Sequence, residues 1–318
     1  MRLNQCLLLL SLTMAAVRAI RTQVVCSRTG APWDSSAVVK AIVCDLDGTL
    51  LNSSKEVTER TFKAVEAARE RGITFIPASG RSRPGIIAVL KDKFGEEITK
   101  SPMVTQNGLR VYGWDDEMLH ESFITPEAAK MTVEYWREHV RDADITMLGS
   151  CGDGMVYEGA DARARAYKNV ERVEIKEMDD LVAAVEDGLK LNRLFFWGSS
   201  REAVQPFRPG LAELIGDAAT LTSGLPNMIE VLPAGASKGH GLGHLLDNLS
   251  IDADQVMALG DEENDREMLA SVGIGIAMGL DNKILKGHAS HMTPSSDEDG
   301  VALAIEQIAL EAVTLVMP

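Results

Sequence analysis

The stretch Ala41-Ile-Val-Cys-Asp-Leu-Asp-Gly-Thr-Leu-Leu51 decides what fold this chain can be expected to adopt. The apolar run that begins at Val38 and leads into it has the length and the β-branched residues of a buried strand. This strand ends in two carboxylates, Asp45 and Asp47, and ligands of open α/β sheets bind beyond the carboxyl ends of the strands. Two acids this close repel each other unless a cation lies between them, and Mg²⁺ prefers oxygen ligands. The stretch therefore predicts a metal-assisted site with one carboxylate free to act as a nucleophile.

A calcium-binding loop and a plain turn are the simpler interpretations of the same residues. An EF-hand loop also begins with D-x-D, and Glu56 falls at its twelfth position. However, its sixth position should be Gly and is Leu50 here, and no helical pattern precedes Asp45. A plain turn stays open on this stretch alone.

Length and charge limit the class of protein and its partners. The chain has 318 residues, of which 45% are hydrophobic and 25% are charged, as in a soluble globular protein large enough for two domains. Its formal net charge of −15 argues against nucleic acid or an anionic membrane as partner. An anionic substrate must therefore be attracted by local positive charge, because distant charges are screened beyond about 8 Å. The sequence does not predict an oligomeric state.

Residues 1–37 are predicted to be a leader rather than part of the fold. They contain four arginines and one acid, Asp34, and the segment from Cys6 to Val17 is apolar except for Ser11 and Thr13. Such a segment suits a signal peptide and is short for a membrane span. The acid-poor stretch that follows resembles a transit peptide. We expect an organelle-targeted or secreted protein with no membrane segment in its mature form, and favour the plastid; an uncleaved tail would leave it in the cytoplasm.

The rest of the chain divides into a core and an insertion. Strand patterns at Ile73–Ile76 and Met103–Thr105 alternate with helical patterns, which predicts a doubly wound parallel sheet with right-handed crossovers. From 113 to 227 this rhythm changes, so we expect an inserted α/β domain with a core of its own. The first pattern resumes at Met228–Leu232, which assigns 38–112 and 228–318 to the core domain.

Polar residues follow several of the predicted strands or begin a helix. They are Asp45 and Asp47, Ser79-Gly80-Arg81, Lys238, and Asp261 with Asn264 and Asp265. Because parallel strands end at one edge of a sheet, these residues are expected to converge. Each has a role available in phosphoryl transfer, where positioning and charge neutralisation dominate.

The predicted roles follow from the chemistry of each group. Asp45 would attack phosphorus, and Asp47 would protonate the leaving oxygen and later activate water. The Ser79 hydroxyl, the Gly80 N–H and Lys238 would hold phosphate oxygens. Asp45, the carbonyl of Asp47 and Asp261 would bind Mg²⁺.

Four motifs in this order resemble those of the haloacid dehalogenase (HAD) superfamily. They are Asp45-Leu-Asp-Gly-Thr-Leu-Leu51, Ser79-Gly-Arg81, Ser237-Lys-Gly239 and Gly260-Asp-Glu-Glu-Asn-Asp265. The insertion between the second and third resembles a C2 cap. Asn107-Gly108, Gly260-Asp-x-x-Asn-Asp-x-x-Met-Leu269 and Ala277-Met-Gly279 are similar to the Cof-type (IIB) phosphatases. Ala277-Met-Gly-Leu-Asp281 departs from many relatives, which have Gly-Asn-Ala after the Met.

The resemblance implies a Rossmann-like α/β core with a cap, and a Mg²⁺-dependent phosphatase of small phosphorylated metabolites, with sugar phosphates favoured. It implies Asp45 as nucleophile and Asp47 as general acid/base. It also implies Mg²⁺ on Asp45, Asp47 and Asp261, and phosphate contacts from the Leu46 N–H, Ser79, Gly80, Lys238 and Asn264. The alternatives are a phosphomannomutase-like phosphotransferase, a flavin-precursor phosphatase, and a catalytically silent protein that binds a phosphorylated metabolite.

Two histidines could suggest a second metal site. His240 and His244 are four residues apart on a predicted helix. Without a third ligand we expect both to be ordinary helix positions. His288 and His291 are interpreted in the same way.

Overall fold

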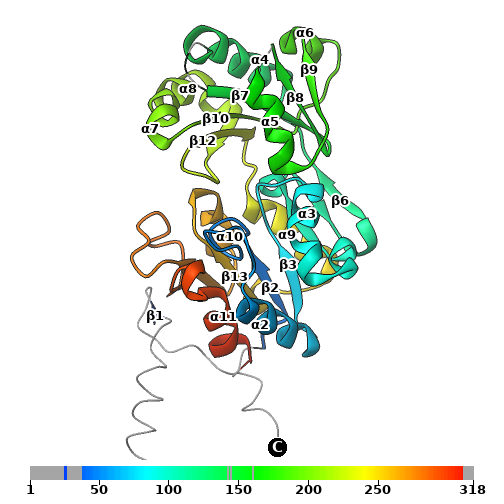
Figure 1. The fold of residues 1–318 in the computed structure, drawn as a ribbon, viewed down its shortest axis with the longest axis vertical. Coiled ribbons are helices and arrows are strands. Elements are labelled where there is room, and N and C mark those ends of the chain that lie inside the picture. Colours follow the sequence, from blue (N-terminus) through cyan, green and yellow to red (C-terminus); the bar gives the residue numbers. More distant parts are fainter. Residues whose placement is uncertain (1–24, 27–37, 142, 144, 160, 311–318) are drawn as a thin grey trace, which may run out of the picture.

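The computed structural model describes residues 25–26, 38–141, 143, 145–159 and 161–310. In Figure 1 these residues form a lower body, which contains both ends of the described chain, and an upper body from its middle. The predicted leader, residues 1–37, lies outside the described residues except for Val25–Cys26. No helix in the described part of the chain is long and apolar enough to cross a membrane.

The lower body is built on a six-stranded sheet with the order β1-β15-β14-β13-β2-β3. Its strands are β1 (Val25–Cys26), β2 (Ala41–Cys44), β3 (Thr74–Pro77), β13 (Val256–Gly260), β14 (Ile274–Met278) and β15 (His291–Thr293). All pairs are parallel except β1 with β15. Cys44 lies opposite Leu259 of β13 and Pro77 of β3, so the ends of these three strands are level.

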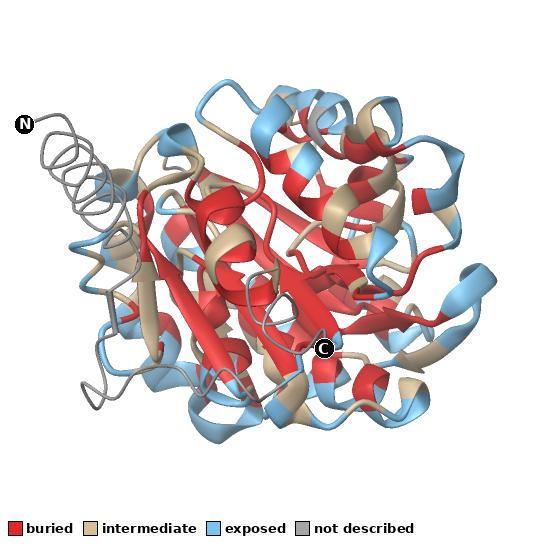
Figure 2. Ribbon diagram, turned by 90° about the horizontal axis from the view of Figure 1, so that it is seen from below, coloured by how far each residue is buried: buried red, intermediate tan, exposed pale blue. Residues whose placement is uncertain are grey.

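Helices cover both faces of this sheet because β2 is apolar on both sides. Ile42 and Cys44 pack with α2 (Glu59–Glu70), α3 (Arg83–Phe94) and α11 (Gly300–Ala304). Ala41 and Val43 pack on the other face with α9 (Lys238–Leu249) and α10 (Arg266–Ala270). Figure 2 shows the buried strands running between partly exposed helices. The expected doubly wound α/β core is confirmed.

The upper body has its own sheet with the order β11-β12-β10-β7-β8-β9. The strands are β7 (Ile145–Cys151), β8 (Gly154–Glu158), β9 (Ile175–Met178), β10 (Arg193–Gly198), β11 (Ala219–Thr222) and β12 (Met228–Pro233), antiparallel except for β8 with β9. The helices are α4 (Pro126–Tyr135), α5 (Ala162–Glu171), α6 (Leu181–Glu186), α7 (Arg201–Val204) and α8 (Arg208–Ile215). Side chains from α4, α6 and α8 form a separate core against this sheet.

Two strands belong to the other body than the one expected from the sequence. Met228–Leu232 was expected to resume the first sheet, and this is wrong: β12 pairs with β10 and β11. An apolar strand fits either sheet, and only its pairing decides between them. Conversely, β6 (Met118–Glu121), expected in the insertion, pairs with β5 (Arg110–Tyr112) beside β4 (Met103–Thr105), and this small sheet packs on α9. We therefore propose that the insertion spans residues 122–233.

Candidate active site

The ends of β2 and β13 and the start of α9 bring distant residues together. Asp45 follows β2, Asp261 follows β13, and Lys238 is the first residue of α9, whose N-cap is Ser237. Asp45, Asp261 and Asp265 each place a carboxylate oxygen within 4.8 Å of the others. The Lys238 ammonium contacts Asp45 and donates to Asp265 Oδ1 at 2.7 Å. Lys238 is completely buried, and its positive charge offsets part of the negative charge of the acidic group.

The three carboxylates of this group carry more negative charge than Lys238 alone can neutralise. Burial raises the pKa of Asp45 to about 7, with the charges of Asp265 and Asp47 adding to the effect and Lys238 opposing it. Burial and the charges of Asp45 and Asp265 also raise the pKa of Asp261 well above its usual range. Burial alone would lower the pKa of Lys238, but Asp265 and Asp45 outweigh it and keep the pKa above its ordinary value. A divalent cation between Asp45 and Asp261 would relieve their repulsion.

The donor atoms fit Mg²⁺. Carboxylate oxygens are the ligands that this hard cation prefers. Both oxygens of Asp265 are already engaged: Oδ1 accepts from Lys238, and Oδ2 accepts from the N–H groups of Asp261 and Glu262. Asp45 and Asp261 are therefore the side chains that would hold the ion, and Asp265 orients Lys238 and the loop after β13.

Asp261 is held in place by two hydrogen bonds that the sequence did not indicate. Thr49 Oγ1 donates to its Oδ1 at 2.9 Å, and Asn282 Nδ2 donates to its carbonyl at 2.8 Å. Gly48 has φ +93°, and a Cβ there would lie 2.2 Å from Asp261 Oδ2. A glycine is thus needed at position 48 both for the turn and for the close approach of this carboxylate.

Asp47 has a different environment from Asp45, only two residues away. Its Oδ2 accepts from Arg81 Nε at 2.6 Å and its Oδ1 from Lys55 Nζ at 2.9 Å. Burial would raise the pKa of Asp47, but the hydrogen bonds and charges of Arg81 and Lys55 outweigh it and lower the pKa to about 2. Its carboxylate lies outside the acidic group that would hold the ion. Metal ligation by its carbonyl stays a prediction.

The residues predicted to contact phosphate lie around Asp45. Ser79, Gly80 and Asn264 line the same cleft as Asp45 and Asp47. Ser79 Oγ accepts from the Arg81 N–H at 3.2 Å, and Asn264 Nδ2 donates to Asn107 Oδ1 at 2.8 Å. Leu46 directly follows Asp45, and its side chain is buried in the core. Their contacts with phosphate stay predictions.

The opposite wall of the cleft comes from the upper body, and its residues were not predicted. This wall consists of Tyr167, Glu171, Arg193, Gly224, Leu225, Met228 and Glu230. Arg193 of β10 and Glu230 of β12 form an ion pair, with 2% and 1% of their side chains exposed. Opposite charges within two apolar strand patterns were the signal available in the sequence, since such residues are rarely buried unless paired.

Hydrogen bonds join the two walls. Glu230 Oε2 accepts from Asn107 Nδ2 of the lower body at 2.8 Å. Glu171 Oε2, at the end of α5, accepts from the Ser82 N–H at 3.0 Å and from the Ser82 hydroxyl at 2.8 Å. Because Ser82 directly follows Arg81, the upper body is linked to the loop that holds Asp47.

A sequence profile of the haloacid dehalogenase-like hydrolases matches residues 42–305. The chain belongs to this family. The resemblance found in the four motifs is confirmed, and the matched range of this HAD hydrolase contains both walls of the cleft.

Individual relatives agree with this placement. The HMP-PP phosphatase of Klebsiella pneumoniae is 29% identical over 261 residues, which cover 82% of this chain and 91% of that protein. The chloroplastic endoribonuclease YBEY of Arabidopsis thaliana is 32% identical over 84% of this chain, which spans only 46% of that protein's length. The solved structure of a HAD subclass IIB sugar phosphatase superimposes with a TM-score of 0.71 at 20% identity, covering 84% of this chain and 98% of the other, and at that identity it shows the fold alone.

Proposed function

We propose that this HAD hydrolase is a Mg²⁺-dependent phosphatase of small phosphorylated metabolites that works through an aspartyl-phosphate on Asp45. The observation that carries the proposal is the buried group of Asp45, Asp261 and Lys238, in which a nucleophile, a cation site and a fixed positive charge lie together. Mg²⁺ bound to Asp45 and Asp261 would neutralise charge on the nucleophile and on the phosphoryl group.

The two aspartates divide the reaction between them. The Asp45 carboxylate attacks phosphorus, a P–O bond forms to its oxygen, and the bond to the leaving alcohol breaks. Asp47 gives a proton to the leaving oxygen and then takes one from the water that hydrolyses the aspartyl-phosphate. Lys238, Ser79, Gly80, Asn264 and the Leu46 N–H hold phosphoryl oxygens.

The ion pairs of Asp47 set a condition on its role. A carboxyl group with a pKa of about 2 carries no proton at neutral pH, so its contacts with Arg81 and Lys55 must weaken before it can act as an acid. Arg81 lines the cleft beside Ser79 and Gly80. An incoming phosphate competes with Asp47 for this guanidinium, and its arrival raises the pKa of Asp47 when the proton is needed.

The composition of the wall opposite Asp45 favours a substrate with polar groups. Glu171, Glu230 and Arg193 offer acceptors and donors that match sugar hydroxyls, which favours a sugar phosphate. Tyr167 with Leu225 and Met228 gives the same wall an apolar side that suits a heteroaromatic ring. This side, together with the HMP-PP phosphatases among the relatives, supports a phosphorylated pyrimidine as the second candidate. A flavin precursor belongs to this heteroaromatic class.

A panel of phosphorylated metabolites, assayed for free phosphate with and without Mg²⁺, tests the proposal. p-Nitrophenyl phosphate, whose hydrolysis releases a coloured product, serves as the generic substrate. Mg²⁺-dependent phosphate release supports the phosphatase, and the values of kcat/KM rank sugar phosphates against phosphorylated heterocycles. Isomerised sugar phosphate without free phosphate would indicate a phosphomannomutase-like transferase instead. No turnover on any compound, with binding retained, would indicate a silent binding protein.

For the destination of the protein we propose the plastid. The acid-poor segment 1–37 has the composition of a leader, and the relative from Arabidopsis is described as chloroplastic. Imaging a fusion of residues 1–37 to a fluorescent protein in plant cells tests this proposal. Uniform cytoplasmic fluorescence would contradict it.

A further inference from the structure

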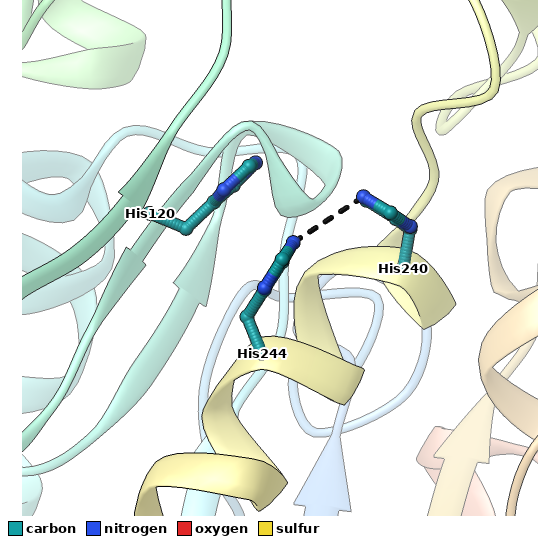
Figure 3. Close-up of side chains that lie close together, drawn as sticks. All are labelled: His120, His240 and His244. Carbon is teal, nitrogen blue, oxygen red and sulfur yellow. Dashed lines mark hydrogen bonds between the residues drawn. The ribbon is translucent and has the colours of Figure 1, made fainter.

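Three histidines from two elements meet on the surface of the lower body. His120 of β6 lies against His240 and His244 of α9 (Figure 3). One ring nitrogen from each lies within 4.8 Å of the other two. The sequence showed the pair on the helix but no third ligand. The small sheet packed on α9 supplies it from a residue far away in the chain.

The spacing of the helix pair fits a tetrahedral metal ion. His244 Nε2 and His240 Nε2 are 3.3 Å apart. Zn–N bonds of 2.0–2.1 Å at the tetrahedral angle place two ligand nitrogens about 3.3–3.4 Å apart. A hydrogen bond between two neutral imidazoles gives a similar distance, so the pair alone does not distinguish the two. A third imidazole with a ring nitrogen within 4.8 Å of both favours the metal site, because three histidines are a known ligand set of Zn²⁺.

The ring of His120 must rotate before all three histidines can bind one ion. The rings of His120 and His244 stack, with centroids 4.1 Å apart and planes at 14°. Lone pairs in nearly parallel planes do not meet on one ion. His120 must therefore rotate about its side-chain bonds, and it has room to do so because it lies at the surface and is only partly buried.

The chemistry of the three groups favours a borderline transition metal over Mg²⁺. Imidazole nitrogen suits Zn²⁺ and similar ions, whereas Mg²⁺ prefers oxygen. Burial and the neighbouring His244 and His240 lower the pKa of His120, which keeps this ring neutral and able to bind a metal. His240 and His244 are exposed, so an ion can reach them from solvent and water can fill a fourth position.

The histidines are separate from the acidic group. Lys238 and His240 are two residues apart on α9, which is a rotation of about 200° around the helix axis. Lys238 therefore reaches the sheet edge at Asp45, and the histidines lie on nearly the opposite side, against β6. β6 is the last strand before the insertion and α9 is the first helix after it. An ion here would tie together the two segments at the base of the inserted domain.

We propose that His120, His240 and His244 form a second metal site, which binds Zn²⁺ or a similar transition-metal ion and joins β6 to α9. This site does not depend on the phosphatase function.

Calorimetric titration of the full chain with Zn²⁺, in the presence of saturating Mg²⁺, tests the site. We expect a Zn²⁺-binding event of one ion per chain that His240→Gln and His120→Gln each weaken by roughly 100-fold or more, since even residues that only support a ligand matter by 10–100-fold. His139→Gln is the matched control, because His139 is exposed and lies in the insertion, and it should bind Zn²⁺ as the wild type does. Visible absorption of bound Co²⁺ should show a nitrogen-ligand spectrum that both cluster variants lose.

Three results would overturn the proposal. The first is no Zn²⁺ binding by the wild type under these conditions. The second is binding that both cluster variants retain. The third is binding that Asp261→Asn abolishes and His240→Gln keeps, which would assign the ion to the acidic group. The two substituted histidines lie on different elements, and thermal unfolding of each variant separates loss of the site from loss of the fold.

Discussion

The two walls of the cleft are built in different ways. The wall with Asp45, Ser79 and Asn264 consists of residues that follow parallel strands, which the topology itself brings to one edge, and Asp261 and Lys238 lie beside Asp45 at this edge. The wall with Arg193 and Glu230 combines side chains of the antiparallel strands β10 and β12 with residues of α5 and of the loop before β12. Loss of a group on the first wall should stop the chemistry. Changes on the second wall should alter the substrate preference and the free energy of unfolding.

The largest expected effect is on the first wall. Asp45→Asn should reduce turnover of p-nitrophenyl phosphate by at least about 10⁴-fold, because an amide is a poor nucleophile. The fold should be retained, since Lys238 keeps its contact with Asp265. Phosphate release and thermal unfolding measure the two properties. Undiminished turnover would remove Asp45 from its role.

Substitutions of Asp47 and Asp261 should affect turnover and Mg²⁺ affinity differently. Asp47→Asn should lower turnover by about 10²–10⁴-fold through loss of acid–base catalysis, and leave Mg²⁺ affinity almost unchanged because its carboxylate is held by Arg81 and Lys55. Asp261→Asn should lower both the turnover and the affinity for Mg²⁺. Calorimetry with Mg²⁺ compares them, and equal loss of affinity in both variants would place the Asp47 carboxylate among the ligands.

On the second wall the expected effect is on stability. Arg193→Met leaves Glu230 as an uncompensated buried charge and should lower the free energy of unfolding by about 3–5 kcal/mol. Arg193→Met with Glu230→Gln should recover most of this loss, because the charge is removed while the amide keeps the size of the side chain. Denaturant unfolding of both variants measures the difference. A double variant no more stable than the single one would show that the pair is not the cause.

The smallest expected effect is the pH dependence of Mg²⁺ binding at Asp45 on the first wall. The pKa of Asp45 is raised to about 7 before a cation binds, so below this pH a proton must leave when Mg²⁺ binds. The Mg²⁺ dissociation constant should therefore rise by at least about tenfold for each pH unit below 7, because Asp261, whose pKa is also raised, must be ionised as well. Asp47→Asn should keep the shape of this curve and move it slightly to lower pH, because the charge of Asp47 is the smallest of the named causes that raise the pKa of Asp45. A flat profile from pH 5 to 8 would contradict this origin of the shift.

The same contrast explains how far the sequence could predict the molecule. Asp45, Ser79, Lys238 and Asp261 follow strands or begin a helix, and such positions can be recognised from a linear pattern. Asp265 belonged to the same motif, but its part in orienting Lys238 depends on which oxygen meets which donor, and spacing does not determine that.

Which residues meet in the opposite wall and in the histidine cluster could not be predicted, because both depend on how the strands pair. Glu230 lies in a strand whose apolar pattern fits either sheet, and β12 was assigned to the wrong one. His120 meets α9 only because β6 adds to a small sheet packed on that helix, and β6 was expected in the insertion. Contacts between elements far apart in the chain carry no local sequence signal.

Mass spectrometry of the enzyme quenched in acid during turnover tests the central claim most directly. With Mg²⁺ and a substrate from the panel, we expect a phosphoryl group on the peptide that contains Asp45, and none in Asp45→Asn or without Mg²⁺. Turnover without any such adduct, or an adduct on a different residue, would contradict the account.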